Sequence, residues 1–301
     1  MSVTFLLLGS VTHSQIVQGA SRLQVEEAAY LYLPLVMKEF QWQGAWIAGK
    51  VVDARDQDQN LQPDPLAGAQ VCTQYSECTT TDANGDYQIS LGDTAWRQVT
   101  ASKEGFLSLT QAVYPLANRT VTLNFVLSQP LTDVVSRIVL TWDTTKRFTA
   151  PVPEGFVNND LDAYLFMEHQ TSNQVIYYDF RGNCTDFPNA CLLYDVQEGG
   201  GPETIDIATL EEGDPPTVYH YAVHHANYFY SQKTMPSLAE LQARVCLYFQ
   251  GTNQANCYLA PEGELQLWYV FSMDQEGNVT LRNCLSDDPV DISGTTPPAC
   301  P

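Results

Sequence analysis

The sequence predicts an all-β protein with two β-sandwich domains in tandem behind an N-terminal signal segment. Short runs alternate between apolar and polar residues, as in Tyr87-Gln88-Ile89-Ser90-Leu91, which is the period of a half-buried strand. Glycine, asparagine and aspartate separate these runs, and those residues favour tight turns. Only Ser237–Arg244 has a helical pattern, with Ser237 and Glu240 at the spacing of a capping box.

Length and charge limit the classes of protein that fit. The 301 residues allow two domains, and a hydrophobic content of 44% is enough for two packed cores. The chain has 35 acidic and 14 basic residues and a formal net charge of −21. Because so few basic residues cannot cover phosphate backbones or an anionic membrane surface, we expect neither nucleic acid nor membrane as a partner. The acid excess fits a soluble exported protein or one that binds cations such as Ca²⁺.

The first 43 residues are typical of an export leader. Phe5–Val11 is a short apolar core, and small residues follow near Gly19, although no basic residue precedes the core. We expect a signal peptide over residues 1–20 and a linker over residues 21–43. A second apolar run at residues 29–37 is too short to span a membrane. The predicted location is therefore secreted, extracellular or at the cell surface.

The cysteines support export. An even number in close sequential pairs predicts four local disulfides formed outside the cytosol. Eight cysteines allow about 105 connectivities, so pairing between sequence neighbours is an expectation. A zinc site is the alternative, but there is no CxxC motif and no pair has a histidine at ligand spacing. The eight are Cys72, Cys78, Cys184, Cys191, Cys246, Cys257, Cys284 and Cys300.

Residues 44–128 contain five segments in a distinctive order. These are GAWIAGKVVDARD, PLAGAQVC, TTTDANGDYQISL, VTASKEGFLSLTQAV and RTVTLNFVL. Together they resemble the carboxypeptidase regulatory-like family. The resemblance implies a non-catalytic, transthyretin-like β-sandwich that stiffens, spaces or supports a neighbouring domain, with a fold close to that of starch-binding modules. The matching residues are Gly49, Val51, Pro65, Leu66, Gly68, Ala69, Val71, Thr81, Asp82, Gly85, Tyr87, Gly105, Phe106, Phe125 and Leu127.

Two groups in this domain have a functional and a structural interpretation. Tyr75 and Trp96 could stack on sugar rings, but packing in the core or at its rim is favoured. Asp82, Asn84 and Asp86 could be read as a Ca²⁺ loop. Turn chemistry is the better account, because the glycine of this segment is not at the loop position that a Ca²⁺ loop requires.

After a linker at residues 129–134, residues 135–284 are predicted to form a larger antiparallel sandwich, followed by a disulfide-tied tail at 285–301. Strands are expected at residues 137–142, 160–165, 175–180, 218–224, 243–249 and 267–271. Several landmarks resemble the YfaP-like family of uncharacterised bacterial exported proteins, which implies architecture and export but no activity. The landmarks are Thr141-Trp142, Asp160-Leu161-Asp162, Asp195, Gly201–Ile205, Tyr219–His224 and Trp268–Phe271.

Four carboxylates in this domain form the candidate site. Asp160 and Asp162 flank one apolar residue, so in a strand they project to the same face. With Asp195 and Glu203 they could supply hard oxygen ligands to Ca²⁺, and carbonyls of Gly199–Gly201 could complete the set. The alternative is that Asp160 and Asp162 form a strand-entry turn and Glu203 accepts hydrogen bonds from loop amides.

Catalytic motifs are absent from the sequence. It contains no GxSxG nucleophile elbow, no HExxH and no glycine-rich phosphate loop. His220 and His224 share one face of a predicted strand, but they would lie about 13 Å apart, too far for one metal ion. His224 and a carboxylate could act as acid and base, although a structural role is favoured.

These observations favour a non-catalytic, secreted or cell-surface binding and adhesion protein. The expected partners are a glycan or another cell-surface protein, and the candidate cofactor is Ca²⁺ at Asp160, Asp162, Asp195 and Glu203. One alternative is a secreted hydrolase that uses the carboxylate cluster. The other is a structural component of the cell envelope.

Overall fold

The fold is described from a computed structural model. The description covers residues 44–55, 62–143, 160–196, 200–225, 236–265, 267–286 and 296–300. These residues all belong to the unit Gln43–Pro301. The predicted leader at residues 1–43, residues 144–159 and Gly199, one of the suggested carbonyl ligands, lie outside the described residues. Every described element is a strand, a turn or coil, so the predicted all-β class is confirmed.

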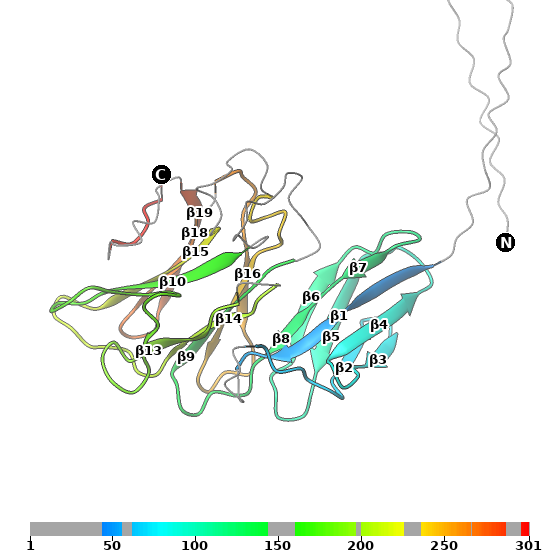
Figure 1. The fold of residues 1–301 in the computed structure, drawn as a ribbon, viewed down its shortest axis with the longest axis horizontal. Helices are drawn as coiled ribbons and strands as arrows, with labels where there is room; N and C mark the ends of the chain where they lie inside the picture. The colour runs from blue at the N-terminus through cyan, green and yellow to red at the C-terminus, as the bar shows by residue number, and fades with distance from the viewer. Residues whose placement is uncertain are drawn as a thin grey trace, which may run out of the picture. The chain divides into compact units, whose positions relative to one another are not determined.

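Two four-stranded sheets are formed from residues 45–127 (Figure 1). One contains β1 (Ala45–Asp53), β4 (Asp86–Leu91), β7 (Thr120–Thr122) and β8 (Phe125–Leu127). The other has the order β3-β2-β5-β6 and contains β2 (Gln70–Thr73), β3 (Cys78–Thr80), β5 (Arg97–Ser102) and β6 (Leu109–Val113). Alternate residues of β4, β5 and β6 are buried in one hydrophobic core, as the two-residue period predicts.

Two larger sheets are formed from residues 136–286, and no sheet among the described residues mixes strands from the two regions. The five-stranded sheet has the order β11-β10-β15-β18-β19 and contains β10 (Leu161–Glu168), β11 (Gln174–Ile176), β15 (Val218–His225), β18 (Leu267–Asp274) and β19 (Val279–Ser286). The six-stranded sheet has the order β12-β13-β14-β9-β16-β17 and contains β9 (Ser136–Thr141), β12 (Gly182–Asn183), β13 (Ala190–Tyr194), β14 (Glu203–Ile207), β16 (Arg244–Phe249) and β17 (Asn256–Leu259).

The core of this second region takes side chains from both large sheets. Ile138 and Leu140 of β9, Leu165 of β10 and Trp142, directly after β9, belong to one buried cluster. Seven successive residues of β10 are buried, from Leu161 to Met167. Because β10 is covered on both faces, its polar residues are buried together with its apolar ones.

The eight cysteines form four disulfides, as predicted, and each joins neighbours in the sequence. Cys72–Cys78 and Cys246–Cys257 link residues that face each other on paired strands. The other two are Cys184–Cys191 and Cys284–Cys300.

Three predicted elements differ from the structure. The alternation of Leu123, Phe125 and Leu127 predicts one closing strand for the first domain, but the structure has β7 and β8 there, because the Asn124 side chain accepts the Lys50 N–H at 2.9 Å between them. The strand expected at residues 175–180 ends at Ile176, where a turn joins Tyr177 N–H to the Phe180 carbonyl at 3.0 Å.

The predicted helix at Ser237–Arg244 is wrong. Its capping box forms, with Ser237 N–H bonded to Glu240 Oε2 at 2.9 Å and Glu240 N–H to Ser237 Oγ at 3.1 Å. The segment nevertheless continues only as turns, because Gln242 adopts a φ of 52° and the chain enters β16 at Arg244. Among the described residues, no helix has the length and apolar character of a membrane span.

Candidate metal centre

Asp160 and Asp162 lie at the start of β10. Asp160 directly precedes the strand, and Asp162 is opposite His224 of β15 in the antiparallel register. The ladder between β10 and β11 begins only at Leu165. The first residues of β10 therefore have strand partners on one side only within the described structure, and their other edge is available for side-chain contacts.

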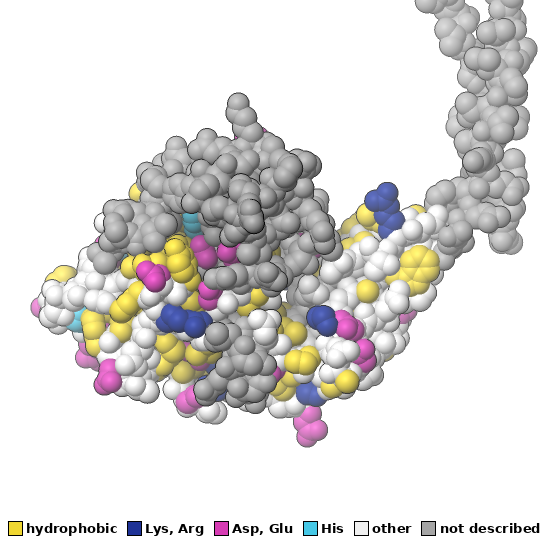
Figure 2. Space-filling view, in the orientation of Figure 1, with side chains coloured by type: hydrophobic (Ala, Val, Ile, Leu, Met, Phe, Trp, Pro, Cys, Tyr) yellow, Lys and Arg dark blue, Asp and Glu magenta, His cyan; other side chains and the backbone are white. Residues whose placement is uncertain are grey.

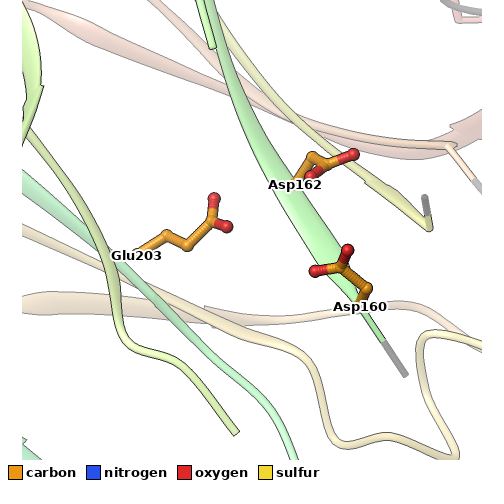
Figure 3. A group of neighbouring side chains, drawn as sticks. All are labelled: Asp160, Asp162 and Glu203. Atoms are coloured by element: carbon orange, nitrogen blue, oxygen red, sulfur yellow. The ribbon is translucent and has the colours of Figure 1, made fainter. Parts of the chain in front are cut away.

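Glu203 reaches this edge from the other large sheet. It is the first residue of β14, directly after a turn at Gly201 and Pro202. Gly201 has a φ of 79°, and a Cβ there would lie 2.9 Å from the Leu140 carbonyl oxygen, so only glycine fits this turn. Glu203 Oε2 accepts the backbone N–H of Ala163 at 2.7 Å. Figure 3 shows the Glu203 side chain extending from β14 toward the end of β10 that carries Asp160 and Asp162.

The three carboxylates come close enough to share one ion. One side-chain oxygen each from Asp160, Asp162 and Glu203 lies within 4.8 Å of the others. Two oxygens bound to the same Ca²⁺ at about 2.4 Å can be at most about 4.8 Å apart, so the spacing fits a shared cation. Asp195, just after β13, lies near enough for its charge to raise the pKa values of Asp160, Asp162 and Glu203. The structure thus groups Asp160, Asp162 and Glu203, three of the four acids that the sequence suggested, and places Asp195 near them but outside the 4.8 Å group.

Burial makes this cluster electrostatically costly. Asp162 is 5% exposed and Glu203 is 1% exposed. Burial and the neighbouring Asp195 raise the pKa of Asp160 to about 7. Burial, followed by repulsion from the other acids, raises the pKa values of Asp162 and Glu203 well above their usual range. At neutral pH the cluster must therefore hold protons or be neutralised by a cation.

The described surroundings supply no compensating positive charge. None of the ion pairs formed between described residues involves Asp160, Asp162 or Glu203. Asp160 Oδ1 and Glu203 Oε1 are buried and accept no hydrogen bond from the described residues. Burial lowers the pKa of His224 to about 4, so this histidine is neutral at pH 7 and cannot act as a counter-ion.

Two contributors were not identified from the sequence. The Ala163 N–H fixes Glu203, but a backbone group leaves no signal in residue type. Tyr164 stacks on Tyr177 with ring centroids 5.5 Å apart, and its buried hydroxyl has no hydrogen-bond partner among the described residues.

The carbonyl of Gly200, one of the suggested additional ligands, accepts the Trp142 N–H at 3.0 Å.

Two other candidate groups from the sequence, the histidines of β15 and the Asp82 turn, have other hydrogen-bond partners. His220 binds the Tyr269 hydroxyl at 2.5 Å through Nδ1 and Glu168 at 3.1 Å through Nε2. Asp82 Oδ1 accepts the N–H groups of Asn84 at 2.8 Å and Asp86 at 2.9 Å, which confirms the turn interpretation.

Tyr75 and Trp96 are not core residues. Their exposed fractions are 60% and 48%. Packing in the core, one of the structural interpretations favoured from the sequence, is therefore wrong for both.

Basic side chains do not form a broad patch on the face shown in Figure 2. Those of the described residues lie there in small separate groups.

Comparisons with known proteins support one of the two resemblances. Residues 47–128 match the model of the carboxypeptidase regulatory-like domain, which confirms the resemblance of the first region. No curated protein matches the chain. The resemblance of residues 135–284 to the YfaP-like family stays a prediction.

Solved structures show only distant likeness. A streptococcal ancillary pilin is 12% identical with a TM-score of 0.20; the alignment covers 73% of this chain and 60% of the pilin, which is less than two thirds of its length. A candidate carbohydrate-binding protein from Bacteroides uniformis is 9% identical with a TM-score of 0.21, over 72% and 95% of the two chains. The major pilin subunit of Bacillus cereus is 8% identical with a TM-score of 0.21, over 82% and 95%. At these TM-scores the likenesses carry no argument about function. The identification is therefore limited to residues 47–128, a carboxypeptidase regulatory-like domain.

Proposed function

We propose that this chain is a non-catalytic binding protein of the cell exterior whose second sandwich is ordered by Ca²⁺. The observation that carries the proposal is the group of Asp160, Asp162 and Glu203, whose oxygens lie within 4.8 Å of one another without a basic partner among the described residues. A buried charge is stable only when it is paired, protonated or bound to a metal. Carboxylate oxygens are hard ligands, which suit Ca²⁺ better than softer transition metals.

The geometry supports a role for the ion in joining the two large sheets. Asp160 and Asp162 belong to the β10 end of one sheet, whereas Glu203 belongs to β14 of the other. A bound ion would add contacts across this end of the sandwich to the Glu203–Ala163 hydrogen bond. Ca²⁺ requires six to eight oxygen ligands. Some of these carboxylates would therefore have to bind it through both oxygens, and further ligands would have to complete the set.

Location outside the cytoplasm is supported by the disulfides. Four of them form between the eight cysteines, and such bonds persist in oxidising compartments. A regulatory-like domain next to a larger sandwich suits a protein that presents a binding surface at the cell exterior. A glycan or another surface protein is the proposed partner.

Thermal unfolding of the oxidised protein tests the metal. We expect Ca²⁺ to raise stability over the EDTA control, by about 2.7 kcal/mol at a hundredfold excess over Kd. Glu203→Gln should abolish the shift while the side-chain carbonyl still accepts the Ala163 N–H. Asp160→Asn, at a less buried position, should weaken the shift.

Glu262→Gln is the matched control, because it removes one exposed carboxylate elsewhere. Its Ca²⁺ shift should equal that of the unaltered protein. Absence of any shift at millimolar Ca²⁺, or an equal shift in Glu203→Gln, would contradict the proposal. Mg²⁺ at the same concentration tests ion selectivity.

A hydrolase is the second candidate. Asp160, with a pKa of about 7, has the property of a general acid near neutral pH. The burial of Asp162 and Glu203 argues against this role, because a polymeric substrate cannot contact both. Turnover of chromogenic glycosides or esters that disappears in Asp160→Asn would favour the hydrolase over the binding protein.

A further inference from the structure

The outward face of the sheet β3-β2-β5-β6 has an unusual composition. Alternation along the strands directs Val71, Val99, Ala101 and Leu109 into the core. The residues between them and at the strand ends are partly or fully exposed. They are Gln70, Cys72, Gln74, Cys78, Thr80, Trp96, Gln98, Thr100, Ser102, Thr110, Ala112 and Tyr114.

None of these outward residues is charged, although the chain has 35 acidic and 14 basic residues. The face instead presents amides, hydroxyls and one disulfide, Cys72–Cys78. Thr100 and Thr110 face each other across β5 and β6 and share a hydrogen bond of 2.8 Å. A flat surface of neutral donors and acceptors can exchange hydrogen bonds with a hydroxyl-rich ligand without competing charges.

Exposed aromatic rings mark one end of this face. Arg97 pairs with Val113, so Trp96 before β5 and Tyr114 after β6 lie next to this last pair on neighbouring strands. Trp96 is 48% exposed and Tyr114 is 60% exposed. Tyr75, also 60% exposed, lies in the turn between β2 and β3 at the same end. Exposed aromatic side chains grouped in this way point to a binding surface.

Local contacts hold this end in a fixed arrangement. The Gln74 side chain accepts the backbone N–H of Gln98 and donates to the Trp96 carbonyl at 3.5 Å, while the Gln74 N–H donates to the Gln98 carbonyl at 3.0 Å. The Arg97 guanidinium lies 4.6 Å from the centre of the Tyr75 ring. Because these side chains are already ordered, ligand binding would cost little conformational entropy.

The basic group at this end is paired with two acids. Arg97 is 2% exposed at its side chain and lies 2.8 Å from Asp93 and 3.8 Å from Glu77. Among the described residues, this end therefore offers an acidic ligand no unpaired basic group. The net charge of −21 also disfavours an acidic polymer.

We propose that the outward face of β3-β2-β5-β6 binds a neutral glycan chain. Trp96 and Tyr114 would stack on the C–H faces of sugar rings, and Gln74, Gln98 and Thr100 would hydrogen-bond to sugar hydroxyls. This inference deepens the proposed binding role by naming a surface and a ligand class. It does not depend on Ca²⁺, because none of these residues belongs to the carboxylate cluster.

Affinity electrophoresis in native gels tests the proposal. The gels would contain dextran, β-1,3-glucan, arabinoxylan, galactomannan or, as an acidic comparison, polygalacturonate, each with Ca²⁺ and with EDTA. We expect at least one neutral polysaccharide to retard the full chain. Trp96→Ala and Tyr114→Ala should each weaken this binding about tenfold, which is the effect of losing about 1.4 kcal/mol.

Two further variants separate stacking from charge. Trp96→Phe should retain most of the binding, because it keeps an aromatic face. Gln98→Glu should also weaken binding by placing a charge on the neutral surface. Phe180→Ala is the control, because Phe180 is 46% exposed and lies outside this face. Thermal unfolding confirms that each variant is folded.

Several results would overturn the proposal. These are no retardation by any neutral polysaccharide, stronger retardation by polygalacturonate, or binding that survives both alanine substitutions. Dimerisation in sedimentation experiments that Trp96→Ala abolishes would assign the face to a second copy of the chain. The metal proposal is tested separately by the Ca²⁺-induced rise in melting temperature of Trp96→Ala. If this rise equals that of the unaltered protein, loss of glycan binding does not affect the metal site.

Discussion

Two acidic residues of β14 are equally buried but have opposite electrostatic surroundings. Asp206 faces Arg137 of β9, whose guanidinium donates to its two oxygens at 2.7 and 2.8 Å. Both side chains of this pair are 1% exposed. Glu203 is also 1% exposed, but it faces Asp160 and Asp162. The buried carboxylate of Asp206 is thus neutralised by an arginine of the same chain. The acids around Glu203 have no such partner among the described residues, which indicates a site that binds protons or a metal ion.

The alternation of the strand explains why the two acids differ. Ile205 and Ile207 point into the core, and Glu203 shares their face of β14, whereas Asp206 lies on the opposite face. Arg137 is the direct cross-strand neighbour of Asp206, while Leu140 is the neighbour of Glu203. The strand register therefore decides whether each buried carboxylate faces a positive charge.

The largest effect is expected from Asp206→Ala. The substitution leaves the Arg137 guanidinium buried without its partner, which should cost about 3–5 kcal/mol of unfolding free energy. In the same urea titrations with EDTA, Glu203→Gln should be neutral or stabilising, because it removes repulsion. Equal losses in the two variants would contradict the contrast between paired and unpaired acids.

The second prediction concerns pH. The folded-state pKa of Asp160 is raised from 3.8 to about 7, so the native state binds more protons than the unfolded state between these values. The EDTA-treated protein should therefore lose stability as pH rises from about 4 to 7, and the raised pKa values of Asp162 and Glu203 should add to this loss.

Ca²⁺ should reverse this trend, because its ligands must be deprotonated. The difference in melting temperature between Ca²⁺ and EDTA should be larger at pH 8 than at pH 5. Glu203→Gln should flatten both profiles, whereas Glu262→Gln should leave them unchanged. An apo protein that becomes more stable between pH 5 and pH 8 would refute this assignment.

The smallest effect is expected from an exposed acid. Asp82→Ala removes two hydrogen bonds to backbone N–H groups and should cost about 1 kcal/mol in urea unfolding. Asp82→Asn should retain most of the stability, because its amide oxygen can accept the same bonds. The Ca²⁺ shift should be unchanged in both variants. A reduced shift would assign metal binding to this turn after all.

Prediction from sequence succeeded where one face of a strand meets solvent. Residues of β4 alternate between exposed and buried from Asp86 to Leu91, so the two-residue pattern is visible in residue type. It was less informative for β10, which is buried on both faces. The Ser237–Glu240 capping box formed without a helix, because entry into β16 outweighed the local preference.

For the candidate site, the sequence identified the acids but not their environment. Asp160 and Asp162 were grouped from their spacing, and Asp195 and Glu203 were added from distant segments. The exposure of Trp96 and Tyr114 at one end of the sheet was harder to predict, because aromatic residues occur both in cores and on surfaces. Only the register of β5 with β6 brings these two residues to the same end of the sheet.

The sequence by itself determined the features that depend on near neighbours: the all-β class, the Asp82 turn, and four disulfides between cysteines close in the chain. The tertiary structure decided which carboxylates meet, how deeply they are buried and which one receives an arginine. The physical reason is that alternation and turn chemistry act over a few residues, whereas desolvation and charge pairing depend on strands brought together from distant parts of the chain.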